Sequence, residues 1–174
     1  MLIKSMSAQT ELDYTATINN HKISQYINIP DGWQIQNEDF NNAIITTSNT
    51  TDEAIISTYV IEADMQNDSI ESIIKFELDS YREFASDRFE VKNMPPITVD
   101  NDKSIAIVKH VTGAADAAYQ AIAYIPESKS VYVIALGTNT HKLFTETLPD
   151  FEKIVQSYKV DRERIWIVTK NTFY

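Results

Sequence analysis

The chain has 174 residues, of which 43% are hydrophobic and 23% are charged, a composition typical of one globular domain with a full core. It contains no cysteine, which excludes disulfides, thiolate catalysis and zinc–thiolate sites. The formal net charge is −10, and the segment from Glu38 to Glu90 carries 13 acidic and three basic residues. Such a field repels nucleic acid, so this segment is expected to be a solvated face or a docking surface for a basic partner.

The two ends of the chain differ from its middle. Residues 1–12 are expected to be a flexible N-terminus, residues 13–160 a single domain, and residues 161–174 a C-terminal extension that adds a strand or packs as a tail. No apolar run approaches 18 residues and the first residues lack an apolar signal core, so no membrane span is expected. Localisation stays open: cytoplasmic if Met1 is the native start, and extracytoplasmic if a signal was removed.

Short strands are predicted in the first third. The runs 14–18 and 23–29 are followed by Pro30-Asp31-Gly32, a strong turn because proline presets φ and glycine accepts a positive φ. Trp33 then resumes an extended path and is expected to close one end of the core. The runs 43–47 and 54–63 flank a polar turn and predict a hairpin.

A helix is predicted over Ser69–Phe84. Its apolar residues recur at helical spacing, with Phe84 or Ala85 as the last member: Ile70, Ile73, Ile74, Leu78 and Tyr81. This stripe is interpreted as core rather than as a cofactor groove. Asp68 and Glu71 resemble a capping box.

Three apolar runs, 104–112, 117–125 and 131–136, are predicted to form the centre of an antiparallel sheet. Both alternating sets of side chains are largely apolar, which indicates that both faces of the sheet are covered. A four-residue loop over 126–129 would place Ala121 and Ala123 on the face of Tyr132 and Ile134.

A turn and a helix complete the predicted domain. Asp100-Asn101-Asp102 is interpreted as a hairpin turn with Asp100 near Lys103, because the glycine and the last acidic ligand of a calcium loop are missing. The last helix is predicted to begin near Thr147, with Pro149 in its first turn, and to end near Tyr158.

Residues that could carry chemistry are few. His21, His110 and His141 are far apart in the sequence and form no metal-binding motif. With three glycines the chain has no glycine-rich phosphate loop, and it has no nucleophile elbow. We therefore expect no catalytic residue, no metal site and no cofactor, although Glu62 and Asp64 could present two carboxylates at one strand end.

Two candidate partner-binding surfaces remain. One is the acidic segment, represented by Glu62 and Asp64. The other is the aromatic end of the chain, Trp166, Phe173 and Tyr174, which either packs on the domain or forms a docking patch. The expected partner is another protein.

The order of elements over about residues 23–160 resembles that of a known superfamily. The resemblance is carried by Ile29-Pro30-Asp31-Gly32-Trp33, by the strand that ends at Asp64 before the Ser69 helix, and by the closing stretch from Phe151 to Ser157-Tyr158. It is to the superfamily of the photosystem II subunit PsbP, the Ran-binding import factor Mog, the bacterial DcrB-like lipoproteins and chaperones of type VI secretion effectors.

The resemblance implies an α+β fold, an α/β/α sandwich with a central antiparallel sheet of about six or seven strands. It also implies a non-enzymatic adaptor, assembly factor or chaperone that binds a partner protein. The alternatives are a carrier of a small apolar ligand or lipid and, less favoured, an uncharacterised hydrolase.

Overall fold

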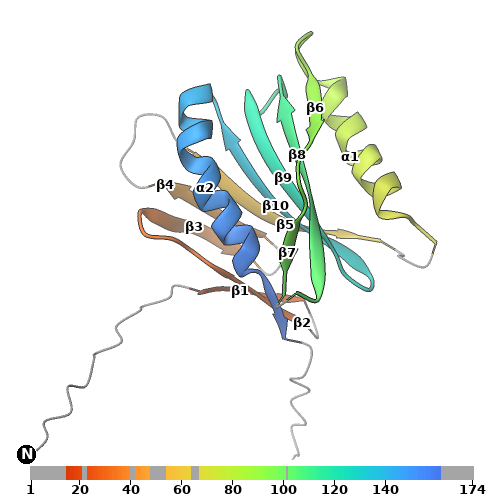
Figure 1. The fold of residues 1–174 in the computed structure, drawn as a ribbon, viewed down its shortest axis with the longest axis vertical. Helices are drawn as coiled ribbons and strands as arrows, with labels where there is room; N and C mark the ends of the chain where they lie inside the picture. Colours follow the sequence, from red (N-terminus) through yellow and green to blue (C-terminus); the bar gives the residue numbers. More distant parts are fainter. Residues whose placement is uncertain are drawn as a thin grey trace, which may run out of the picture.

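A computed structural model describes residues 15–20, 23–39, 42–47, 54–63, 67–100 and 102–161. In this part of the chain an eight-stranded antiparallel sheet has the order β3-β4-β5-β10-β9-β8-β6, with β7 also paired to β8 (Figure 1). Its strands are β3 (Trp33–Asp39), β4 (Asn42–Thr47), β5 (Ile55–Glu62), β6 (Glu90–Asn93), β7 (Ile97–Val99), β8 (Ser104–Thr112), β9 (Tyr119–Pro126) and β10 (Ser130–Thr138). A smaller sheet has the order β1-β2-β11, from β1 (Thr15–Asn20), β2 (Ile23–Asn28) and β11 (Lys159–Asp161).

The predicted α/β/α arrangement is confirmed, with one helix on each face of the large sheet. Helix α2 (His141–Ser157) covers one face together with residues of β2 and β11, and helix α1 (Ile70–Glu83) covers the other. Among the described residues the sheet has one strand more than the upper prediction of seven. The reason is that β6 and β7 pair with two successive parts of β8.

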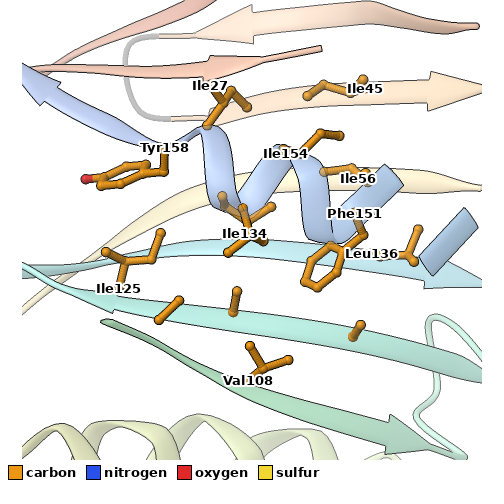
Figure 2. Packing of buried hydrophobic residues seen from close by; sticks show 14 of the residues in the cluster. Ile27, Ile45, Ile56, Val108, Ile125, Ile134, Leu136, Phe151, Ile154 and Tyr158 are labelled. Carbon is orange, nitrogen blue, oxygen red and sulfur yellow. The ribbon is translucent and has the colours of Figure 1, made fainter. Parts of the chain in front are cut away.

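The side chains of the central hairpin have the predicted facing, but the register differs by two residues from the one that a four-residue loop over 126–129 gives, because Pro126 already pairs with Val131. Ile134 of β10 lies opposite Ala123 of β9, and Leu136 lies opposite Ala121. Large side chains thus face small ones on the side that α2 covers, as a close-packed layer requires. Figure 2 shows Phe151 and Ile154 of α2 pointing into this layer.

Helix α2 begins at His141 rather than near Thr147, so the predicted start is wrong. Thr140 caps the helix by accepting a hydrogen bond from Leu143 N at 3.3 Å. Pro149 therefore lies inside the helix, where its missing N–H leaves the carbonyl of Thr145 without its usual helical donor.

Helix α1 has the predicted bounds, but its predicted cap is wrong, and of the two residues offered as the end of its stripe the structure selects Ala85. Ser69, not Asp68, is the cap, because its hydroxyl accepts from Ser72 N at 3.2 Å. Phe84 is 75% exposed because it is the residue at which the chain leaves the helix. The helical spacing therefore no longer directs its ring to the core, and Ala85 is half-buried instead.

The Asp100 turn joins the two sheets. It forms the predicted hairpin between β7 and β8, and Asp100 and Asp102 adopt positive φ angles of 52° and 66°. The buried Asp100 carboxylate accepts from Val160 N at 3.2 Å, and its own N–H donates to the Tyr158 carbonyl at 2.9 Å. The turn thereby fixes the start of β11, which pairs with β2.

Candidate functional site

A polar cluster lies between α1 and the sheet. The Tyr59 hydroxyl of β5 donates a hydrogen bond to Glu77 Oε1 of α1, and the Tyr81 hydroxyl lies 3.2 Å from the Tyr59 hydroxyl. Tyr59 reaches α1 because it shares the α1 face with Tyr124 and Val133, its neighbours on β9 and β10. We call Tyr59, Glu77, Tyr81 and Tyr124 the tyrosine–glutamate cluster.

This cluster holds its tyrosines in the neutral form. Burial raises the pKa of Tyr59, and the negative charge of Glu77 raises it further. The same two causes, in the same order, raise the pKa of Tyr124. Burial also raises the pKa of Tyr81; the hydrogen bond with Tyr59 lowers it, and the charges of Glu77 and Asp116 raise it further. Neutral hydroxyls can donate to the carboxylate, so the cluster anchors α1 on the sheet.

The cluster predicts a loss of stability at alkaline pH. Its tyrosines have a raised pKa when folded and an ordinary pKa of 10.0 when unfolded. Their stabilising contribution is therefore complete below pH 10.0 and is lost as the pH rises above it, because only the unfolded chain then releases protons. Urea unfolding between about pH 8 and pH 11 should show this fall. The fall of the unfolding free energy with pH should be shallower in the variant Tyr59→Phe/Tyr124→Phe. Equal slopes in the variant and the wild type would show that these tyrosines do not cause the fall.

A pocket of about 230 Å³ adjoins the cluster at Tyr81. Its floor is the α1 face of the sheet, where Ser57 of β5 lies opposite Ala135 of β10. Its lining residues are Ile55, Ser57, Tyr81, Asp116, Ala117, Gln120, Ala135, Leu136, Gly137, Thr138 and Asn139. We call this cavity the Tyr81 pocket.

The Tyr81 pocket corrects the inference that a sheet with two apolar faces is sealed by its helices. Ser57, Ala135 and Gly137 are small, and α1 does not fill the space above them. Gly137 is held close to the connection between β8 and β9, since a Cβ built on it would lie 3.2 Å from the Cβ of Ala117. These small residues can be read from the sequence, but small residues on a strand are as compatible with a packed layer as with a pocket.

Polar groups lie at one side of the pocket. The Gln120 side chain is 5% exposed, and its Nε2 donates to Asp116 Oδ1 at 2.9 Å. Asp116 itself is exposed, so the bond orients its carboxylate at the pocket wall. Among the described residues that line the pocket there is no lysine, arginine or histidine.

The outer face of α1 carries exposed aromatic side chains. Phe76 is 81% exposed and Phe84 is 75% exposed. Phe76 lies within α1, and Phe84 is the residue that caps its C-terminal end. Phe76 lies off the apolar stripe that the sequence predicts for the core. From this position its exposure could have been predicted from the sequence.

The structure places one of the five predicted partner-binding residues. Glu62 is exposed at the end of β5 and pairs in register with Ser130. The other four, Asp64, Trp166, Phe173 and Tyr174, lie outside the described residues. The aromatic-tail surface therefore stays a prediction.

The two described histidines have structural contacts. His110 meets the ring of Phe144 edge-on at 5.2 Å, and burial lowers its pKa. His141 meets Tyr119 edge-on at 5.4 Å. No group of three or more metal-ligating side chains occurs in the described part of the chain. None of its helices is both long and apolar enough to cross a membrane.

A scan against protein-family models and a search of curated protein sequences find no match to the chain. Solved structures do match. Cyanobacterial PsbP (CyanoP) from Synechocystis is 8% identical, with a TM-score of 0.56 over 91% of this chain and 99% of that one. LpqN, involved in cell envelope biogenesis of Mycobacterium tuberculosis, is 12% identical, with a TM-score of 0.49 over 79% and 83%. A point mutant of Mog1 is 9% identical, with a TM-score of 0.48 over 83% and 94%. The chain thus has a PsbP/Mog-like fold, as the resemblance implied.

Proposed function

We propose that the protein is a non-enzymatic protein-binding domain, acting as an adaptor, assembly factor or chaperone, and that it docks its partner on the outer face of α1. The exposure of Phe76 and Phe84 carries this proposal. Aromatic side chains are enriched in interfaces, where burying one contributes about 1.5–3 kcal/mol. The superfamily that the sequence resembles implies the same class of function.

The surroundings of these two rings favour a basic partner. Exposed acidic residues follow along α1 and beyond its end, among them Glu71, Glu83 and Asp87. Lys75 is paired with Asp79, and the Arg82 guanidinium lies 5.4 Å from the centroid of the Phe89 ring. Lys75 and Arg82 thus already have partners within the protein, and the exposed acidic side chains make the surface around the two rings negative.

The Tyr81 pocket does not favour the alternative of a lipid or apolar-ligand carrier. Its volume of about 230 Å³ is below the roughly 300–1,000 Å³ of most small-molecule sites. Asp116 and Gln120 also place polar groups in its wall.

Affinity capture followed by binding measurements tests the proposed function. The wild-type chain is used to capture and identify a partner from the native organism, and the purified pair is then titrated. The variant Phe76→Ser/Phe84→Ser should weaken binding by about tenfold or more, the usual effect of truncating a central aromatic contact. Ile35→Ser is the control. Ile35 is also an exposed apolar residue, but it lies on the edge strand β3 and not on α1, so this variant should bind as wild type.

Two further arms test the surfaces proposed from the sequence. Charge reversal at Glu62 and Asp64 tests the acidic segment, and truncation after Asp161 tests the aromatic end. Binding that survives the Phe76/Phe84 variant but is lost in one of these arms would move the docking surface there. A partner bound equally by every variant would overturn all three surfaces.

A further inference from the structure

The Tyr81 pocket has the size of a site for one side chain. At about 230 Å³ it could hold several water molecules, each of which takes about 30 Å³, but it is too small for a typical metabolite. Tyr81 lines it from the face of α1 that packs on the sheet, so a partner segment docked at the exposed Phe76 and Phe84 would reach the pocket by continuing past the edge of the helix. A long side chain of that segment could therefore enter.

The charges at the pocket select a cation. The charges that act on the Tyr81 hydroxyl are both carboxylates, Glu77 and Asp116. Glu77 Oε2 is buried and has no hydrogen-bond partner among the described residues. The nearest base along α1, Arg82, is stacked on Phe89 rather than placed among the lining residues. An incoming cation would therefore meet the negative charge of Asp116 at the pocket wall, while Glu77 adds negative charge near Tyr81 without lining the pocket.

The shape of the polar groups favours a guanidinium over an ammonium. The aromatic ring of Tyr81 can stack on a planar cation, and the Asp116 carboxylate can accept two parallel N–H bonds from it. The Gln120 amide fixes this carboxylate at 2.9 Å, so less freedom is lost on binding. Arginine combines a planar charge, several donors and an apolar stem suited to Ala117 and Ala135.

We propose that the Tyr81 pocket binds an arginine side chain of the partner protein, stacked on Tyr81 and paired with Asp116. This proposal rests on the proposed function, since it supplies the residue by which a basic partner is recognised. It assigns the pocket a role in specificity, while Phe76 and Phe84 supply apolar contact area.

Titration of the full chain with N-acetyl-arginine methylamide tests the pocket without knowledge of the partner. Amide NMR signals of Gln120 and Gly137 should shift and saturate. The citrulline analogue has nearly the same shape without the charge and should leave them in place. Asp116→Asn should weaken the arginine probe by about fivefold or more, whereas Asp87→Asn, a matched change at an exposed site outside the pocket lining, should not.

A second variant guards against a misfolded Asp116→Asn protein. Ala135→Met fills the floor of the pocket and keeps both carboxylates, so it should also abolish the shifts while the remaining spectrum stays dispersed. Equal shifts with citrulline, or arginine shifts confined to Glu83 and Asp87, would overturn the proposal.

The two proposals fail in different ways. If Phe76→Ser/Phe84→Ser loses the partner while Asp116→Asn and Ala135→Met retain it, the docking surface stands and the arginine pocket is wrong. If the probe binds at Gln120 but the phenylalanine variant retains the partner, the proposed docking surface is wrong and the pocket stands as a guanidinium site.

Discussion

Replacing Phe151 by alanine is expected to lower the free energy of unfolding by about 3–5 kcal/mol, the usual cost of truncating a buried phenylalanine. Its ring is 0% exposed and lies in the core between α2 and the sheet, near Leu136 (Figure 2). This core also holds Ile27 of β2 and Tyr158 before β11. The cavity would therefore weaken the contact of α2 with the large sheet and with the small one. Urea unfolding followed by circular dichroism measures the loss.

Glu152→Ala is the control for this prediction. Glu152 follows Phe151 in α2 but is exposed, so its truncation should change the free energy of unfolding by no more than about 0.5 kcal/mol. A Phe151→Ala variant that loses less than about 1 kcal/mol would mean that α2 does not close the core in solution.

The sequence predicts the centre of this fold well because the determinants there are local. The hairpin of β9 and β10 depends on a short loop and on alternating side chains, and both can be read from about 20 consecutive residues. The register, with Ile134 opposite Ala123, differs by two residues from the predicted loop, but a shift of two residues keeps every side chain on its face, so the predicted facing is right. The stripe of α1 is equally local, which explains why its bounds are right.

The start of α2 could not be predicted by the rule that proline marks a first turn. His141 and Lys142 are polar and exposed, so no apolar residue marks the first two positions of the helix. Leu143 and Phe144 do continue the stripe backwards from Phe151. Pro149 inside the helix costs free energy because it removes a helical hydrogen bond. The burial of apolar side chains before and after it, among them Phe144 and Phe151, offsets this cost.

The candidate site was beyond sequence reasoning for a different reason. The Tyr81 pocket combines α1, three parts of the sheet and the connection between β8 and β9. No periodic pattern links Tyr81 with Asp116 or Gly137, because their proximity depends on how far α1 lies from β10. Phe76 is the exception, since an aromatic residue outside the core stripe of an amphipathic helix can be recognised directly.

Replacing Gly113 by alanine is expected to destabilise the protein by about 2–5 kcal/mol and to weaken binding of the arginine probe. Gly113 has φ +77°, and a Cβ there would lie 2.7 Å from Ser86 Oγ and 2.9 Å from the backbone carbonyl atoms of Arg88. The Gly113 carbonyl also accepts from Ser86 N at 2.9 Å, which ties the segment after α1 to the connection between β8 and β9. That connection contains Asp116, so relief of the clash should displace the carboxylate at the pocket.

Gly32→Ala separates the two causes of destabilisation in Gly113→Ala, the clash of the new Cβ and the cost of a positive φ. Gly32 has a similar φ of +86°, but no atom lies within 4 Å of its built Cβ, so only the cost of the left-handed conformation remains, about 1–2 kcal/mol. Urea unfolding of both variants should therefore rank Gly113→Ala as clearly less stable. The arginine titration should be weakened in Gly113→Ala alone, because Gly32 lies in the turn before β3 and does not line the Tyr81 pocket. Equal losses of stability would show that the segment after α1 moves aside freely, and the probe would then bind both variants alike.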